Sequence, residues 1–199
     1  MSMRVVLATR NAKKLRDMQH LLADFEVIYL PADAPDVAET AQTFEGNALI
    51  KARAASRLLG MPAIGDDSGL EVDALAGAPG VYSARFAALA GAGEGDEANN
   101  RLLLARLQGA PRRTARFRSV LAWVDGDEII LGSGACEGVI LESQRGAGGF
   151  GYDPLFFAPE LGKTFAEATL EEKGQVSHRA RAAAELRVGL KSRGRIGTP

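Results

Sequence analysis

Two adjacent aspartates are the residues of this chain best suited to chemistry on a phosphate. Asp66 and Asp67 follow a short apolar stretch and lead into Ser68 and Gly69. Adjacent carboxylates repel each other unless a cation compensates them. Mg²⁺ accepts one or two carboxylates together with phosphate oxygens and waters. The pair therefore predicts metal-assisted chemistry on a phosphate group, and an ordinary acidic turn is the alternative.

A second group of polar residues lies between a predicted strand and a predicted helix. It includes Thr9, Asn11 and Lys14. The N-terminus of a helix offers free backbone N–H groups and the positive end of the helix dipole. Lys14 adds a flexible cation that suits phosphate. This segment predicts a binding site for a phosphate or a nucleotide, and a capped helix with exposed lysines is the alternative.

Two later segments could contact a base. Glycines at 146–151 let the backbone approach a ligand closely, and Phe150 among them could stack on a flat base. Lys173, His178 and Arg179 supply polar donors near the start of the last predicted helix. The alternatives are a core phenylalanine and a solvated basic helix.

Three common functional motifs were considered, and the sequence supports none of them. Residues 146–151 match Gly-x-Gly-x-x-Gly, but a strand rather than a helix is predicted after them. Residues 162–164 resemble the end of a P-loop, but Phe157 stands where its first glycine is needed. The chain has no Gly-x-Ser-x-Gly elbow, so the usual α/β-hydrolase site is excluded.

The elements that must position these residues alternate between strands and helices in the first half of the chain. Apolar runs and period-3.6 patterns predict strands at 4–8, 26–30, 63–65, 115–124, 128–141 and 155–157, and helices at 13–23, 44–59, 97–108 and from 178 onward. Asp125-Gly126 predicts a hairpin turn, and Thr169 with Glu172 predicts a capping box. Together these elements predict an α/β protein with a mixed sheet.

Composition excludes several other classes. The chain has 199 residues, enough for one domain or for one domain with two lobes. It carries 24 Lys and Arg against 25 Asp and Glu, so bulk nucleic-acid binding is disfavoured. The single Cys136 rules out an internal disulfide. No apolar run is long enough to cross a bilayer.

Taken in order, the motifs resemble the inosine triphosphate pyrophosphatase family. The matching segments are Ala8-Thr9-x-Asn11-x-x-Lys14, Thr43-Phe44-x-x-Asn47-Ala48, Lys51-Ala52, Asp66-Asp67-Ser68-Gly69-Leu70, the run from Gly77 to Arg85, the run from Gly148 to Pro154, and Ser177-His178-Arg179. Each segment alone is weak. The complete ordered set is specific and extends from Leu7 to about Arg179.

This resemblance implies a long mixed β-sheet flanked by helices, arranged as two lobes with a central cleft. Chain length predicts a single domain over 1–199, and its terminal position predicts a flexible tail at 193–199. The implied activity is Mg²⁺-dependent hydrolysis of ITP, dITP and XTP to the monophosphate and pyrophosphate, which cleanses the nucleotide pool. A cytoplasmic homodimer is expected, with no membrane partner and no stable nucleic-acid partner.

The resemblance also implies roles for individual residues. Asp67 would be the proton acceptor and a magnesium ligand, with Asp66 close by as a second catalytic residue. Glu39 would be the other magnesium ligand, and Asp66 is the alternative for that role. The substrate-binding residues would be Thr9, Arg10, Asn11, Ala12, Lys13, Lys14, Lys51, Ser68, Phe150, Gly151, Tyr152, Asp153, Lys173, His178 and Arg179. Arg179 and protonated Lys173 have donors only, which favours a 6-oxo purine over adenine.

Three other interpretations stay open at this point. A related pyrophosphatase could act on modified pyrimidine nucleotides with similar chemistry. A nucleotide-sensing module could bind without turnover. A DNA-associated protein could use the arginines around a predicted strand, namely Arg112, Arg113, Arg116 and Arg118.

Overall fold

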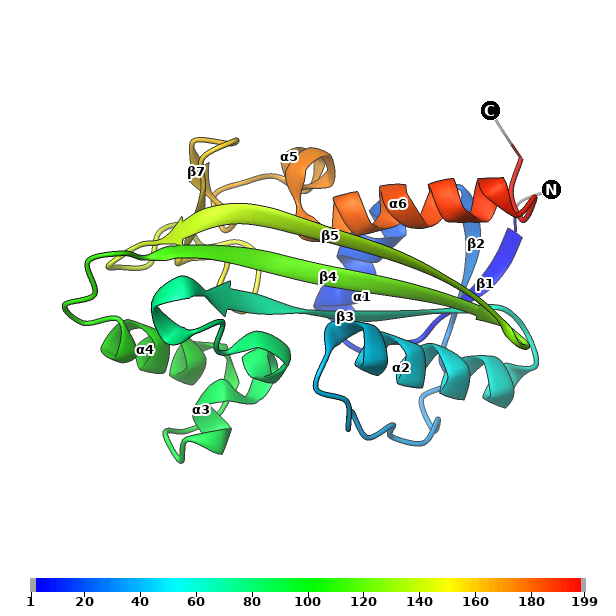
Figure 1. Ribbon diagram of the computed structural model, residues 1–199, viewed down its shortest axis with the longest axis horizontal. Coiled ribbons are helices and arrows are strands. Elements are labelled where there is room, and N and C mark those ends of the chain that lie inside the picture. Colours follow the sequence, from blue (N-terminus) through cyan, green and yellow to red (C-terminus); the bar gives the residue numbers. More distant parts are fainter. Residues whose placement is uncertain (1–2, 198–199) are drawn as a thin grey trace. The chain divides into compact units, whose positions relative to one another are not determined.

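The computed structural model describes residues 3–197, and it confirms the predicted α/β fold (Figure 1). The strands are β1 (Met3–Leu7), β2 (Phe25–Tyr29), β3 (Ala63–Val72), β4 (Thr114–Asp125), β5 (Glu128–Ile140), β6 (Phe156–Ala158) and β7 (Lys163–Thr164). The α-helices are α1 (Ala12–Leu21), α2 (Phe44–Leu59), α3 (Phe86–Leu89), α4 (Gly95–Arg106), α5 (Leu170–Val176) and α6 (His178–Ser192). Two 3₁₀ helices, Asp73–Leu75 and Gly80–Arg85, precede α3.

The strands form one mixed sheet in the order β2-β1-β3-β4-β5-β6-β7. Strand β1 runs parallel to both β2 and β3. Strands β5, β6 and β7 pair antiparallel. The two-residue turn between β4 and β5 contains Gly126, whose φ of 58° favours glycine. The predicted hairpin is therefore confirmed.

Strand β3 differs from the prediction. The sequence predicts a strand at 63–65 that leads directly into residues 66–69 and a second strand at 70–74, but one strand, β3, runs without a break from Ala63 to Val72. Leu70 and Val72 are fully buried. Pairing with neighbours on both sides of β3 and this burial outweigh the weak strand propensity of the Asp-Asp-Ser-Gly segment. The short elements β7 and α3 were also missed, because two to four residues carry no periodic signal.

The chain divides into two compact units. The first comprises the residues up to Asp67, Ser119–Gly134 and the residues from His178 onward. The second comprises Ser68–Arg118 and Ala135–Ser177. Each unit has its own buried core, and β3, β4 and β5 contribute residues to both.

In the first unit, helices cover both faces of the sheet. Leu7 and Ile64 pack with α1 and α6 through residues such as Met18 and Leu186. Val6 packs in a second cluster that includes Ala55 of α2. Side chains alternate across a strand, so neighbouring residues of β1 and β3 must face different helices.

The last described residues are tied to the first unit. The guanidinium of Arg195 pairs with Glu128 and lies 3.4 Å from a carboxylate oxygen of Asp125. It also lies 5.4 Å from the centre of the Trp123 ring. Of the tail predicted to be flexible, 198–199 lie outside the described residues.

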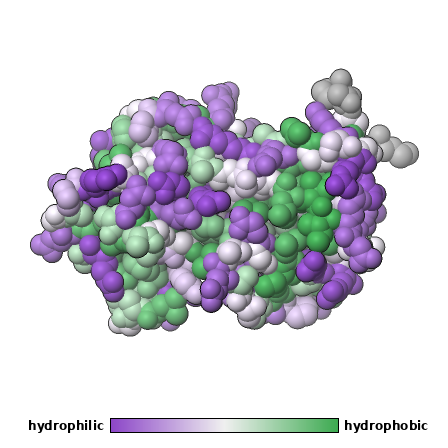
Figure 2. All heavy atoms as spheres, in the orientation of Figure 1, coloured by the Kyte–Doolittle hydropathy of each residue, from purple (hydrophilic) through white to green (hydrophobic). Residues whose placement is uncertain are grey.

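Figure 2 shows hydrophobic side chains gathered on the right of the face that it displays, with polar side chains around them. Within residues 3–197, no helix is long and apolar enough to cross a membrane.

Glycines allow two helices to approach the sheet of the first unit by their backbones. A Cβ on Gly65 would lie 2.2 Å from the carbonyl oxygen of Ala48 in α2. A Cβ on Gly134 of β5 would lie 2.2 Å from the carbonyl oxygen of His178 in α6. Helix α2 carries Lys51, and α6 carries Arg179. These contacts therefore set how deeply two cation-bearing helices lie against the strands.

We predict that Gly65→Ala destabilises the protein by about 1 to 3 kcal/mol, because a backbone carbonyl cannot move away as a flexible side chain can. Urea unfolding followed by circular dichroism measures the change. Gly197→Ala is the control, because a Cβ there meets nothing within 4 Å. Equal stability of Gly65→Ala and the wild type would contradict the close approach.

Candidate active site

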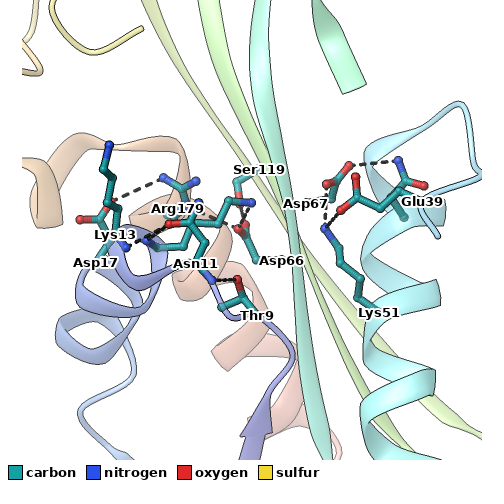
Figure 3. Close-up of polar contacts among 12 residues, drawn as sticks. Thr9, Asn11, Lys13, Asp17, Glu39, Lys51, Asp66, Asp67, Ser119 and Arg179 are labelled. Atoms are coloured by element: carbon teal, nitrogen blue, oxygen red, sulfur yellow. Dashed lines mark hydrogen bonds and ion pairs between the residues drawn. The ribbon is translucent and has the colours of Figure 1, made fainter. Parts of the chain in front are cut away.

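The two aspartates at the centre of the candidate site point in opposite directions (Figure 3). Asp66 and Asp67 are successive residues of β3, and successive side chains of a strand leave opposite faces of the sheet. The two carboxylates, although adjacent in sequence, therefore lie on different faces of the sheet. Each carboxylate has its own set of cations, delivered by different helices.

Asp66 lies on the face that α1 and α6 cover. One of its oxygens is 2.8 Å from Nζ of Lys14 and 3.6 Å from Nε of Arg179. Its other oxygen accepts a hydrogen bond of 3.0 Å from the Ser119 hydroxyl. Arg179 also lies 3.5 Å from Asp17. Asp66 is 1% exposed, so its carboxylate holds cations in place and has no free path to a substrate.

Charge decides the ionisation of Asp66. Burial alone would raise its pKa, but the cations of Lys14 and Arg179 outweigh burial and hold the pKa of Asp66 far below its usual range. The carboxylate is therefore ionised over the whole range in which proteins are normally folded.

The turn before α1 is built by side chains that were predicted to bind substrate. Oδ1 of Asn11 accepts hydrogen bonds from the backbone N–H groups of Lys13 and Lys14, so Asn11 caps α1. Oγ1 of Thr9 accepts the backbone N–H of Asn11. Helix α1 begins at Ala12. The side chains of Thr9 and Asn11 thus orient the first turn of α1, from which Lys14 reaches Asp66.

Arg10 turns away from this group. Its guanidinium donates to the carbonyl oxygen of Ala34 at 3.0 Å and pairs with the carboxylate of Asp36. These contacts fasten the 31–41 loop to the start of α1. Lys13 is exposed beside it.

Asp67 lies on the face that α2 covers, and one lysine connects it to Glu39. Nζ of Lys51 is 2.8 Å from Asp67 and 2.9 Å from Glu39. The amide of Asn47 donates to the other oxygen of Asp67 at 3.3 Å and accepts the backbone N–H of Ala41 at 3.0 Å. Asn47 therefore ties the segment that carries Glu39 to the carboxylate of Asp67.

The pKa shifts on this face follow from burial and shared charge. Burial raises the pKa of Asp67, and the attraction of Lys51 offsets only part of this effect while Glu39 adds repulsion. Burial alone would lower the pKa of Lys51, but Asp67 and Asp66 outweigh it and raise that pKa. Lys51 therefore stays protonated between the carboxylates of Asp67 and Glu39.

The donor set fits Mg²⁺ held partly by a substrate. Among the residues that the structure describes, no group of three or more His, Cys, Asp or Glu could hold a metal by itself. Glu39 and Asp67 are a pair of carboxylates within reach of one cation. Mg²⁺ is commonly bound by one or two carboxylates plus phosphate oxygens, so this pair matches its needs. Asp66, on the other face, does not belong to the pair.

The second unit brings together most of the other predicted residues. Oδ2 of Asp153 accepts hydrogen bonds from Nζ of Lys173 at 2.8 Å and from the backbone N–H of Phe150 at 3.1 Å. The ammonium of Lys173 lies 5.7 Å from the centre of the Phe150 ring. Ser68 belongs to this unit and is half-buried, whereas His178 belongs to the first unit and is buried.

Tyr152 has a structural side chain. It is buried in the core of the second unit, and its hydroxyl donates to the carbonyl oxygen of Ser83 at 2.8 Å. Burial raises the pKa of Tyr152, with a smaller contribution from Asp96. This hydroxyl is neutral and already engaged, so it is not available to a substrate.

Sequence reasoning missed several residues of these networks. Asn47 lies within the family-like segment 43–48, but nothing in the sequence indicated its contact with Asp67. Ser119 and Asp17 carried no signal, because they meet Asp66 and Arg179 only through the fold.

The arginines considered for DNA binding are largely engaged within the second unit. Arg113 donates to the carbonyl oxygens of Leu107, Ile140 and Leu141. Arg116 pairs with Asp73 and Glu137. These contacts disfavour the DNA-associated interpretation.

The fold and the site define a class of protein: a mixed-sheet α/β protein with paired carboxylates and lysines suited to phosphate chemistry. The chain belongs to the Ham1 family, whose family model matches residues 5–188. It is 52% identical over 187 residues to a dITP/XTP pyrophosphatase of Symbiobacterium thermophilum, with 91% of each chain covered. These matches confirm the predicted family.

Solved structures agree with this assignment. The Ham1 protein of Staphylococcus aureus matches with a TM-score of 0.82 at 42% identity, covering 96% of this chain and 99% of that one. A HAM1 protein from Coxiella burnetii matches with a TM-score of 0.83 at 39% identity and the same coverage.

We predict that Asp66→Asn lowers the free energy of unfolding by about 3 to 5 kcal/mol at neutral pH, because Lys14 and Arg179 lose their buried counter-charge. The folded-state pKa of Asp66 lies below its unfolded value, so its contribution is present above about pH 4 and is lost as the pH falls toward the folded-state pKa. Urea unfolding at several pH values measures both effects.

The stability difference between wild type and Asp66→Asn should therefore shrink as the pH falls below about 4. Asp33→Asn, at an exposed position, is the control and should follow the wild type. A difference that stays constant down to low pH would contradict the assigned role of Asp66.

Proposed function

We propose that this chain hydrolyses dITP, ITP and XTP to the nucleoside monophosphate and pyrophosphate. The observation that carries the proposal is the Glu39–Lys51–Asp67 group, in which one protonated lysine holds two carboxylates beside each other. Relatives named dITP/XTP pyrophosphatase match nearly the whole chain at about half identity, which supports the substrate class.

Asp67 is the proton acceptor in this proposal. A water attacks the α-phosphorus, its proton passes to the carboxylate of Asp67, and pyrophosphate leaves. The pKa of Asp67 is raised, and a base works best when its pKa approaches the operating pH. Lys51 and Asn47 each donate to one oxygen of Asp67, so they fix the direction in which the carboxylate can accept a proton.

Cations of the chain serve the phosphates. Lys14 is held by Asp66 at the first turn of α1, where the positive end of the helix dipole also favours an anion. Mg²⁺, when bound, supplies charge neutralisation on the phosphate oxygens, and Glu39 and Asp67 are the residues that would hold it. The group of the first unit therefore combines a base with charge stabilisation.

Phe150 and Lys173 are the proposed base contacts. Phe150 offers an aromatic face, and Lys173 offers only donors, which match the 6-oxo oxygen of hypoxanthine and xanthine. Adenine would place an amino donor against a donor, and an unpaired buried donor is costly. The homodimer stays a prediction from the family resemblance, and the cytoplasmic location stays a prediction from the sequence.

A nucleotide panel tests the activity. Purified protein with Mg²⁺ should release monophosphate and pyrophosphate from dITP, ITP and XTP, and much less from dATP or from modified pyrimidine triphosphates, as measured by chromatography. Chelation of Mg²⁺ should abolish turnover. Equal rates on all nucleotides would reject the proposed base contacts, and no turnover at all would favour a nucleotide-sensing module.

Asp67→Asn tests the proton acceptor. We expect a folded protein whose kcat falls about 100-fold or more, because an amide cannot take the proton. Steady-state assays with dITP measure the change, and circular dichroism checks the fold. Asp33→Asn, which makes the same substitution at an exposed position, should keep the wild-type rate. Near-normal turnover by Asp67→Asn would show that another group accepts the proton.

A further inference from the structure

The 149–153 segment of the second unit is a tight turn that presents Phe150. Gly149 and Gly151 have φ values of 70° and 60°, in the left-handed region that favours glycine. The carboxylate of Asp153 folds back beneath the turn, where it binds the backbone N–H of Phe150 and Nζ of Lys173. A Cβ on Gly149 would lie 2.2 Å from that carboxylate, so the turn is closed around it.

Helix α4 holds this turn by both backbone groups of one residue. The N–H of Gly151 donates to Oδ2 of Asp96 at 2.9 Å. The carbonyl oxygen of Gly151 accepts the amide N–H of Asn100 at 3.0 Å. Asp96 and Asn100 are four residues apart on α4, so their side chains lie on the same side of the helix. We call this pair of contacts the Gly151 clamp.

The orientation of Asn100 leaves one of its own atoms unsatisfied. Its Oδ1 is buried and has no hydrogen-bond partner within the described part of the chain. Buried polar atoms without partners are rare and carry a free-energy cost. The one hydrogen bond that this side chain makes in the described structure is its donation to the carbonyl oxygen of Gly151.

We propose that Asp96 and Asn100 are positioning residues that set base discrimination by fixing the turn beneath Phe150. The inference rests on the proposed function, in which Phe150 and Lys173 contact the purine. Hypoxanthine and guanine share the 6-oxo group and differ by one 2-amino group, so donors to the 6-oxo group cannot separate them. Discrimination at the 2-amino group then depends on how rigidly the turn holds Phe150 against the base, and the Gly151 clamp fixes that turn.

The neighbouring Asn99 provides a matched control. It lies on the same helix and is as buried as Asn100, at 2% exposure each. Its amide binds the carbonyl oxygen of Ala84 and the backbone N–H of Ala87, and neither belongs to the 149–153 turn. Loss of Asn99 should therefore disturb the unit to a similar extent without releasing Gly151.

The test compares Asp96→Ala, Asn100→Ala and Asn99→Ala by two measurements. Hydrogen exchange with mass spectrometry reports on the backbone of 149–153, and steady-state assays give kcat/KM for dITP and for dGTP. Asp96 is exposed, so its variant should fold even where the Asn100 variant is unstable. We expect exchange in the turn to accelerate about tenfold in the clamp variants, and the dITP-to-dGTP ratio to fall by a similar factor.

Asn99→Ala should leave both the exchange of this turn and the substrate ratio unchanged. Faster exchange with an unchanged ratio would overturn the proposal, because the clamp would then be structural only. An unchanged exchange rate in Asp96→Ala would overturn it as well. If the wild type hydrolyses neither nucleotide, the proposed function itself fails, and this outcome is separate from both of the others.

Discussion

The burial of two successive carboxylates within one strand is the constraint on which the first unit depends. Each ionised group needs a cation close by, since an unpaired buried charge is very unfavourable. Because the two side chains leave opposite faces of β3, one helix cannot serve both. Lys14 of α1 and Arg179 of α6 serve Asp66, whereas Lys51 of α2 serves Asp67. Because helices cover both faces of the strands, each aspartate has cations on its own side of the sheet.

Small residues make this arrangement possible. The backbone of α2 approaches β3 at Gly65, immediately before the aspartates, and α6 approaches β5 at Gly134. A lysine or arginine at the helix surface reaches a carboxylate inside a sheet only if the helix axis lies close to the strands. Packing and charge compensation are therefore coupled, and a change in one alters the other.

Much of the fold followed from the sequence, because apolar periodicity, the capping box and the hairpin turn are local signals. Helix α2 begins and ends at the predicted residues, and Thr169 with Glu172 forms the predicted capping box. The sequence did not reveal that β3 continues through the aspartates, since pairing and burial decide that. For the candidate site, residue type and position pointed to Lys14 and Asp67. Lys51 looked locally like a surface lysine and was expected there only from the family resemblance, and the structure brings it to Asp67. Partners such as Ser119 have no local signal, because long-range folding brings them to the site.

The alternation of Asp66 and Asp67 bears on how this segment can change during evolution. Substitutions along β3 alter one contact at a time, but the insertion or deletion of a single residue before Asp66 would reverse the direction of every side chain that follows. The carboxylate that meets Lys51 would then meet the cations of α1 and α6, and the functions of the two faces would be exchanged. The number of residues from Ala63 to Asp67 is therefore constrained in its own right, in addition to the identities of Gly65, Asp66 and Asp67.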